Sequence, residues 1–318
     1  MSEGERRASL APFTTLKAGG PAEVLYRVRS AQEMREAAAS LQQSHTPTTI
    51  LGWGSNVLPS DAGVSGAVII NQSSAINISS DGTVIADSGC GFQELFLKTA
   101  QAGLRGLEFG VGIPGTLGGA LVSNAGAYRS CVSEFLTSLE IVFEGRTQTV
   151  DPSFMKFSYR DSLLRGDSAP PCAIVRVTMK LPSGCAKTIY DEARDYQRQR
   201  IGKQPPPASA GSFFKNVYSQ GLADSLDNLP ERLRAAGVVP AGYLIEKVGL
   251  KGARFGGAQL HWRHANFMTN VGGAQAGDIR RLAEHARAVV RDAYGVFLEE
   301  EVLYLGDWSG WTETGLLQ

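Results

Sequence analysis

The chain has 318 residues, with 31 lysines and arginines against 31 aspartates and glutamates, so its formal net charge at pH 7 is zero. Hydrophobic residues make up 43% and charged residues 19%, which is ordinary for a folded domain and excludes a disordered chain. The lack of a basic excess argues against nucleic-acid binding, and the length favours two domains over one.

Membrane and secretion signals are not evident. The longest aliphatic runs, such as residues 67–70, are far too short to cross a bilayer. Arg6 and Arg7 are not followed by an apolar segment, so no signal peptide is predicted. The four cysteines are far apart and form no C-x-x-C pair, which is typical of thiols in a reducing compartment. We therefore expect a cytoplasmic protein without membrane insertion.

The first half of the chain alternates strand and helix signals. Residues 22–28 form a short β-type run, and Ser30 to Glu33 match a capping box that opens a helix. The apolar face of this helix is formed by Met34, Ala37, Ala38 and Leu41. Further predicted elements are strands at 48–51 and 66–70, a helix at 92–101 ended by Gly103, a hairpin at 139–150 and a strand at 172–181.

A change in composition follows the last of these strands. Residues 189–201 are polar and helix-forming, and three prolines at 205–207 end this segment. The clearest helix of the chain begins at Asp278, carries apolar residues at three- and four-residue spacing and ends at Gly295. A strand is expected at residues 301–305. The order of elements predicts an α+β protein with two units.

Glycine is unusually frequent, at 37 of 318 residues or about 12% against a usual value of about 7%. Many glycines lie in two clusters, one at residues 52–56 and the other from Gly110 to Gly119. Backbone without Cβ atoms lets a ligand approach closely, and successive N–H groups in a tight turn bind anions. The first cluster by itself fits two interpretations equally well, a structural turn and a phosphate-binding loop.

The second cluster contains a formal G-x-G-x-x-G pattern at Gly110, Gly112 and Gly115. At this glycine content, about half a match per chain is expected by chance. Pro114 disrupts the start of a helix, and no acidic residue lies at the offset that a dinucleotide fingerprint requires. No Gly-Lys-Ser/Thr follows either cluster, which excludes a Walker loop. The loop is therefore predicted to pass close to a flat or crowded ligand.

Two histidines, His261 and His264, are three residues apart and would suit a metal ion. No third ligand with zinc-like spacing is evident, so structural or substrate-side roles are favoured. No metal site is predicted.

Motifs spread over nearly the whole chain point to one family. Around the second glycine cluster they are residues 106–109, 112–116 and 124–128. Further motifs lie at residues 15–22, 51–56, 158–162 (SYRDS), 210–216 (AGSFFKN), 249–252 and 298–302. By these motifs and by their order along the chain, the sequence resembles the UDP-N-acetylenolpyruvoylglucosamine reductase family. The short span between Arg160 and Ser212 resembles the compact type II branch of that family.

The resemblance implies an α+β fold, in which an FAD-binding domain of the vanillyl-alcohol-oxidase type precedes a smaller α/β substrate-binding domain. We expect the FAD-binding region at residues 1–182, with two subdomains that meet near residues 60–70. The substrate-binding domain is expected at residues 183–298. Residues 299–318 are expected to return to the FAD region as a strand and tail.

The resemblance also implies a reaction. NADPH would reduce UDP-N-acetylglucosamine enolpyruvate to UDP-N-acetylmuramate through non-covalently bound FAD, in peptidoglycan precursor synthesis and hence in cell wall biogenesis, cell shape and cell division. The main alternative is a flavin oxidase of the same superfamily that uses oxygen and an alcohol substrate. Such oxidases often link the flavin to a histidine or cysteine in the glycine loops, and neither cluster contains one. A binding protein without chemistry is the non-enzyme alternative.

The catalytic positions of the family fall on Arg160, Ser212 and Glu301. A guanidinium stays charged and can hold a carboxylate through two hydrogen bonds, so Arg160 suits the negative charge left by hydride addition. Ser212 would supply a proton to the carbon beside the carboxylate. Glu301 would act with Arg160, and strand alternation would separate it from Glu300. All three positions are filled, which argues against the non-enzyme alternative.

The binding positions implied by the resemblance form two sets. The FAD set consists of Gly52, Trp53, Gly54, Ser55, Asn56, Gly112, Ile113, Gly115, Thr116, Gly119 and Asn124. The substrate set, for the UDP-sugar, consists of Tyr128, Tyr159, Lys215, Asn216, Lys251 and His264. The chain departs from the family pattern at Trp53, where glycine is common, at Val217, where proline is usual, and at His264, where some members carry glutamine.

Overall fold

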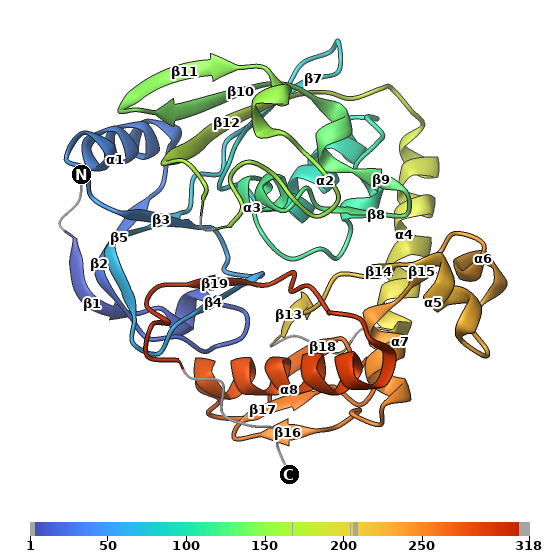
Figure 1. Cartoon of the computed structure of the whole chain (residues 1–318). Coiled ribbons are helices and arrows are strands. Elements are labelled where there is room, and N and C mark those ends of the chain that lie inside the picture. Colours follow the sequence, from blue (N-terminus) through green and yellow to red (C-terminus); the bar gives the residue numbers. More distant parts are fainter. Residues whose placement is uncertain (1–3, 167, 204, 206–208, 312–318) are drawn as a thin grey trace. The chain divides into compact units, whose positions relative to one another are not determined.

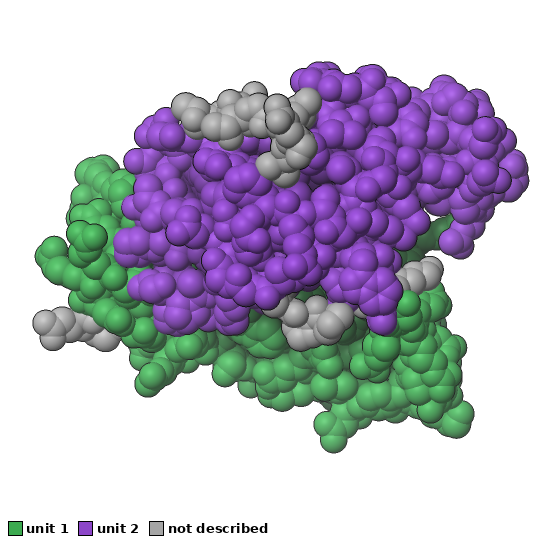
Figure 2. All heavy atoms as spheres, turned by 90° about the horizontal axis from the view of Figure 1, so that it is seen from below, with its two compact units in different colours: residues 1–8, 22–54, 64–202 green, residues 9–21, 55–63, 203–318 purple. Residues whose placement is uncertain are grey.

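The computed structural model describes residues 4–166, 168–203, 205 and 209–311, and the chain folds into two compact units (Figure 2). Unit 1 comprises residues 1–8, 22–54 and 64–202, and unit 2 comprises residues 9–21, 55–63 and 203–318. The boundary after residue 202 differs from the division predicted after residue 182. The reason is that the helix at 186–203 buries Ile189 and Ala193 in the core of unit 1. The predicted proline stop falls mostly outside the described residues, at 206 and 207.

The first sheet of unit 1 contains parallel strands (Figure 1). Its order is β1 (Glu5–Ser9), β2 (Pro21–Val28), β5 (Val64–Asn71) and β3 (Thr48–Leu51). Helix α1 (Ala31–Gln43) connects β2 to β3. The predicted cap of α1 is confirmed, because the Ser30 side chain accepts a hydrogen bond from the Glu33 N–H. The Glu33 carboxylate accepts one from the N–H of Arg29.

The second sheet of unit 1 is antiparallel. Its order is β11 (Arg146–Val150), β10 (Leu136–Phe143), β12 (Cys172–Lys180), β7 (Thr83–Asp87) and β6 (Ile76–Ile78). One face buries side chains with α1, and the other packs against α2 (Phe92–Gln101) and α3 (Leu117–Val122). The predicted hairpin is β10–β11, and its turn places Glu144 and Gly145 at positive φ.

The remaining elements of unit 1 are α4 (Ala186–Lys203) and the short pair β8 (Gly126–Ala127) and β9 (Ser130–Cys131). Short 3-10 helices lie at Glu108–Gly110, Val132–Phe135 and Pro152–Met155. Helix α2 has the predicted bounds, and Gly103 after it has a φ of 71°. The predicted helix at 189–201 is confirmed as part of α4.

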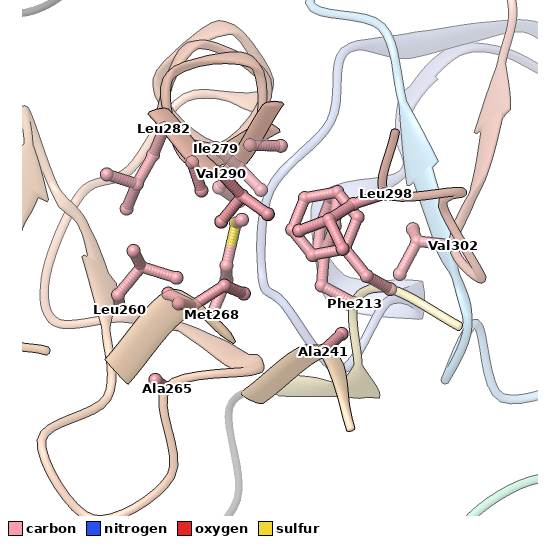
Figure 3. Packing of buried hydrophobic residues seen from close by; sticks show 14 of the residues in the cluster. Phe213, Ala241, Leu260, Ala265, Met268, Ile279, Leu282, Val290, Leu298 and Val302 are labelled. Atoms are coloured by element: carbon pink, nitrogen blue, oxygen red, sulfur yellow. The ribbon is translucent and has the colours of Figure 1, made fainter. Parts of the chain in front are cut away.

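Unit 2 is built on an antiparallel sheet covered by one long helix. The sheet order is β13 (Ser209–Ser212), β18 (Phe267–Asn270), β17 (Ala258–Leu260) and β16 (Arg254–Phe255). Helix α8 (Ala276–Tyr294) begins two residues before the predicted start and ends, as predicted, at Gly295. The apolar face of α8 meets the sheet in one buried cluster that also contains Phe213, Leu298 and Val302 (Figure 3).

The other elements of unit 2 are α5 (Gln220–Ser225), α6 (Glu231–Arg234), α7 (Ala241–Lys247), β14 (Val217–Tyr218), β15 (Val238–Val239) and a 3-10 helix at Ala11–Phe13. Strand β19 (Leu303–Leu305) runs parallel to β4 (Val57–Pro59). The strand predicted at 301–305 was therefore wrong at its start, since the N–H of Glu301 donates to Phe213 instead of joining β4. Among the helices that the structure describes, none combines the length and apolar character needed to cross a membrane.

Candidate active site

The two glycine clusters meet within unit 1. A Cβ atom added to Gly52 would lie 2.2 Å from Thr116 Oγ1, so only glycine permits this approach. The Trp53 ring packs on Gly91, where an added Cβ would lie 3.0 Å from the ring. Gly91 in turn pairs with Thr116 in an isolated β-bridge. The predicted FAD residues Gly52, Trp53 and Thr116 are therefore neighbours.

The loop from Gly112 to Thr116 exposes backbone on one side. Gly112 and Gly115 have φ angles of 73° and 131°, which side chains rarely tolerate. A Cβ added to Gly112 would meet only Arg200, with Cδ at 3.4 Å. The Thr116 side chain accepts a hydrogen bond from the Gly119 N–H and so caps α3. A glycine loop with open space beside its backbone suits a ligand that carries a flat ring and phosphates.

Buried polar atoms without a partner occur on residues before and after this loop in the chain, and on Arg200, which lies beside Gly112. Among the described residues, no hydrogen-bond partner is found for Glu108 Oε1, Asn124 Oδ1 or Arg200 Nε. Buried polar atoms are normally paired, so such atoms indicate a missing polar group. The orientation of Asn124 is fixed, because its Nδ2 donates to the Ser158 carbonyl at 2.9 Å. These residues fit FAD.

Two residues that sequence reasoning missed lie on α4. The Tyr196 ring stacks on the Tyr128 ring, with centroids 3.8 Å apart and planes within 7°. The Arg200 guanidinium lies 5.6 Å from the Tyr128 ring centroid and donates to the Phe109 carbonyl. Burial lowers the pKa of Arg200, and the charge of Arg160 acts in the same direction. The four-residue spacing of Tyr196 and Arg200 on one helix face is the signal that could have found them.

Arg160 is held in a strained turn of unit 1. Its φ is 54°, a conformation that costs a non-glycine residue about 1–3 kcal/mol. The guanidinium donates from Nη2 to the Gly126 carbonyl and lies 5.5 Å from the Tyr159 ring centroid. The Ser162 hydroxyl donates to the Val122 carbonyl. The turn that carries Arg160 and Tyr159 is therefore fastened to the segment that follows the glycine loop.

Ser212 and Glu301 are brought to neighbouring backbone positions in unit 2. Ser212 ends β13, and the carbonyl of the next residue, Phe213, accepts a 2.7 Å hydrogen bond from the Glu301 N–H. The Asn56 side chain donates to the Glu301 carbonyl at 2.9 Å. Asn56 was predicted to bind FAD, and its amide nitrogen here supports Glu301.

The three consecutive acids at 299–301 are directed to different partners. Glu299 Oε1 lies 2.5 Å from the ammonium group of Lys215. The Glu300 carboxylate accepts a hydrogen bond from the Tyr304 hydroxyl at 2.9 Å and pairs with Arg287 of α8 at 3.3 Å. Neighbouring acids in extended backbone point to opposite sides, and the Glu300 carboxylate is directed to α8.

The other predicted substrate residues of unit 2 also have local partners. Lys251 pairs with Glu246 at 2.6 Å. His264 is half-buried, desolvation lowers its pKa, and its Nδ1 accepts a hydrogen bond from the Asn266 N–H. His261 Nδ1 accepts one from the Arg263 N–H. Both imidazoles therefore hydrogen-bond within the turn between β17 and β18, and the substrate role of His264 stays a prediction. Asn216 is half-buried after Lys215.

The predicted site residues are divided between the two units. Unit 1 contains residues 52–54, the second glycine cluster, Asn124, Tyr128, Tyr159 and Arg160. Unit 2 contains Ser55, Asn56, Ser212, Lys215, Asn216, Lys251, His264 and Glu301. The unit boundary thus passes through the first glycine cluster, between Gly54 and Ser55. The convergence of Arg160 with Ser212 and Glu301 stays a prediction.

Family models match both parts of the chain. Residues 22–151 match a model described as an FAD binding domain. Residues 202–305 match the C-terminal domain of UDP-N-acetylenolpyruvoylglucosamine reductase. The α+β fold class with an FAD-binding domain and a separate C-terminal domain is thereby confirmed.

Named relatives match over nearly the full length. UDP-N-acetylenolpyruvoylglucosamine reductase of Prochlorococcus marinus is 36% identical over 306 residues, which cover 95% of this chain and 98% of the relative. The protein of the same name from a Synechococcus strain is 38% identical over 304 residues, covering 94% and 90%. The crystal structure of UDP-N-acetylenolpyruvylglucosamine reductase from Thermus caldophilus has a TM-score of 0.75 at 31% identity, covering 95% and 99%. The chain belongs to the UDP-N-acetylenolpyruvoylglucosamine reductase family.

Proposed function

We propose that the chain is an FAD-dependent reductase that converts UDP-N-acetylglucosamine enolpyruvate to UDP-N-acetylmuramate at the expense of NADPH. The observation that carries this function is full-length similarity to reductases of that name, with both family domains present. The glycine loops of unit 1 and the unpaired buried polar atoms of Glu108, Asn124 and Arg200 support FAD binding. The oxygen-using oxidase is not favoured, because neither glycine cluster contains a histidine or cysteine for a flavin link.

The reaction adds a hydride and a proton across the enolpyruvyl double bond. Bound FAD, held by the glycine loops of unit 1, would supply the redox chemistry that carries a hydride from NADPH to the substrate. Addition of the hydride at C3 leaves an electron pair at C2, next to the carboxylate. The residues of the chain must stabilise this charge and deliver one proton.

The catalytic roles fall on three residues. Arg160 holds the carboxylate and stays charged throughout, since a guanidinium does not deprotonate. Ser212 gives its hydroxyl proton to C2 and is reprotonated from solvent, which balances the reaction. Ser212 is half-buried at the end of β13, so its side chain is partly accessible. Glu301 acts with Arg160 at the same carboxylate.

The remaining contacts of the UDP-sugar fall on Tyr128, Tyr159, Lys215, Asn216, Lys251 and His264. Two phosphates need at least one cation, which Lys215 and Lys251 provide. The product belongs to peptidoglycan precursor synthesis, in the cytoplasm. All four cysteines lie in the described part of the chain as free thiols, which supports a reducing location.

The function is tested on the purified protein under anaerobic conditions. We expect a yellow protein that releases FAD on denaturation, is bleached by NADPH and regains its colour with the enolpyruvyl UDP-sugar. Rapid recolouring by oxygen without any response to the UDP-sugar favours the oxidase. A colourless protein without affinity for FAD contradicts both functions.

The acid role is tested by Ser212→Ala. This variant is expected to keep flavin reduction by NADPH and to lose flavin reoxidation by the UDP-sugar, because only the second step needs the proton. Both half-reactions are measured by stopped-flow absorbance. Ser209→Ala is the matched control on the same strand, since among the described residues its side chain accepts one local hydrogen bond, from the Gly211 N–H. Unchanged turnover of Ser212→Ala removes this residue from the acid role.

A further inference from the structure

Asn266 binds both polar groups of the Phe214 backbone. Its Oδ1 accepts a hydrogen bond from the Phe214 N–H at 2.9 Å, and its Nδ2 donates one to the Phe214 carbonyl at 2.8 Å. The Phe213 N–H donates to the Asn266 carbonyl at 2.7 Å. Three hydrogen bonds therefore join Asn266 to the two residues that directly follow Ser212.

This group of bonds is shielded from water. Asn266 is 3% exposed, and Phe213 and Phe214 are each 1% exposed. A buried backbone group that loses its partner cannot turn to water, and its hydrogen bonds are strong in this environment. The hydrogen bonds of the Asn266 side chain therefore restrain the Phe213–Phe214 backbone more strongly than those of a solvent-exposed asparagine side chain would.

The opposite side of the same backbone meets the acidic segment. The Phe213 carbonyl accepts the Glu301 N–H at 2.7 Å, and the Lys215 N–H donates to the Glu299 carbonyl at 2.8 Å. Phe214 and Glu300 form an isolated antiparallel bridge. Residues 213–215 thus lie between Asn266 and residues 299–301, within unit 2.

We infer that Asn266 is a positioning residue for Ser212 and Glu301. By holding the backbone of Phe214, it sets where Ser212 lies relative to the Glu301 segment. The inference rests on the proposed function, in which Ser212 is the acid and Glu301 its neighbour. Asn266 itself touches neither the reacting atoms nor the substrate.

The surroundings of Asn266 leave it little freedom. Its own N–H donates to His264 Nδ1 at 3.3 Å, and its chain neighbours Ala265 and Phe267 are both buried. Phe267 is also the register partner of Ser212 in the β13–β18 pair. The side chain therefore has one orientation in which both of its bonds to Phe214 form.

Asn266→Asp tests the inference, because aspartate keeps the shape of the side chain but changes its hydrogen bond to the Phe214 carbonyl. An ionised aspartate accepts from the Phe214 N–H but cannot donate to the Phe214 carbonyl, whereas a protonated aspartate does both. Burial raises the pKa of a carboxyl group, so protonation falls within reach of moderately acidic pH. At pH 8 we expect flavin reoxidation by the UDP-sugar to slow at least tenfold and flavin reduction by NADPH to stay within twofold. Near pH 6 the reoxidation rate should recover relative to wild type.

A second readout does not depend on activity. Amide hydrogen exchange of residues 209–216, followed by mass spectrometry, should be faster in Asn266→Asp at pH 8 once corrected for the intrinsic pH effect, and near the wild-type rate at pH 6. Asn266→Ser, which is too short to bond both groups, should show the faster exchange at both values. If Asn266→Asp does not fold, the rates of the two half-reactions and the hydrogen exchange are measured on Asn266→Ser instead.

Asn270→Asp is the matched control, at the end of β18, the strand that directly follows Asn266. The Asn270 side chain likewise bonds backbone groups, accepting from Gly272 and Ala274 and donating to Leu16. Asn270→Asp should lower stability and change the rates of the two half-reactions by the same factor. The inference is overturned if Asn266→Asp slows both half-reactions equally, or if its flavin reoxidation is as fast as that of Asn270→Asp at pH 8.

The failure of the inference can be told from failure of the proposed function. A normal rate of flavin reoxidation in Ser212→Ala contradicts the acid role of Ser212. If Ser212→Ala loses flavin reoxidation while Asn266→Asp keeps the wild-type rate, only the inference about Asn266 is contradicted.

Discussion

Lys215, a proposed substrate ligand, is buried next to an exposed acid. It is only 9% exposed, and its ammonium group lies 2.5 Å from Glu299 Oε1. A buried cation needs such a partner, and the Lys215 N–H also donates to the Glu299 carbonyl. The side chain of Glu299 is 70% exposed, so water can hydrate the carboxylate when Lys215 turns to another anion. This pairing supports the proposed role of Lys215 as a diphosphate ligand.

Lys215→Gln should therefore weaken substrate binding more than catalysis. We expect the KM for the UDP-sugar to rise about tenfold or more, because a charge-assisted hydrogen bond to a phosphate is lost, while kcat changes much less. Steady-state kinetics with varied UDP-sugar measure both values. Lys247→Gln on α7, whose ammonium packs over the Tyr243 ring, is the control and should leave KM unchanged. A wild-type KM in Lys215→Gln excludes the diphosphate role.

At the scale of elements, the proposed FAD site depends on the contact between two short loops. The glycine at position 52 allows the loop after β3 to approach the cap of α3, and Thr116 is 3% exposed and cannot move away freely. The same threonine accepts the Gly119 N–H, so a displaced Thr116 also loses the cap.

Gly52→Ala should reduce the affinity for FAD. An added Cβ at 2.2 Å from Thr116 Oγ1 forces the two loops apart, and we expect the Kd for FAD to rise at least tenfold. Titration of the apoprotein with FAD, followed by flavin fluorescence, gives the Kd. Gly221→Ala in α5 is the control, because an added Cβ there meets nothing within 4 Å. Equal Kd values for both variants refute the importance of this contact.

For the whole molecule, the half-buried His264 connects the free energy of unfolding to pH. The pKa of His264 is lowered by burial, so the folded state binds its proton less readily than the unfolded state, whose histidine pKa is about 6.5. The unfolded state gains protons first as the pH falls. The stabilising contribution is therefore complete above pH ~6.5 and is lost as the pH decreases towards the folded pKa.

His264→Gln should accordingly flatten the pH dependence of stability. The wild-type Tm is expected to fall between pH 7 and pH 5.5, and the fall should be smaller in His264→Gln. Thermal unfolding at a series of pH values measures the effect. His45→Gln, which changes an exposed histidine after α1, is the control and should keep the wild-type slope. Parallel curves for wild type and His264→Gln contradict the argument.

Much of the secondary structure follows from local patterns. The cap at Ser30, the bounds of α2 and the end of α8 at Gly295 were predictable, because each depends on a few consecutive residues. The start of β19 was not, because Glu301 has a partner in Phe213, almost ninety positions away. The hydrophobic pattern of a strand does not show with which distant segment the strand forms hydrogen bonds.

The sequence by itself determined the family, the FAD-binding and C-terminal domains and the candidate residues, because their motifs are short and local. The tertiary structure alone decided the unit boundary after residue 202, the contact of Gly52 with Thr116 and the stacking of Tyr196 on Tyr128. It also decided that Asn266 holds the Phe214 backbone. The physical reason is that such contacts depend on which distant segments exclude water together, and no local pattern records that choice.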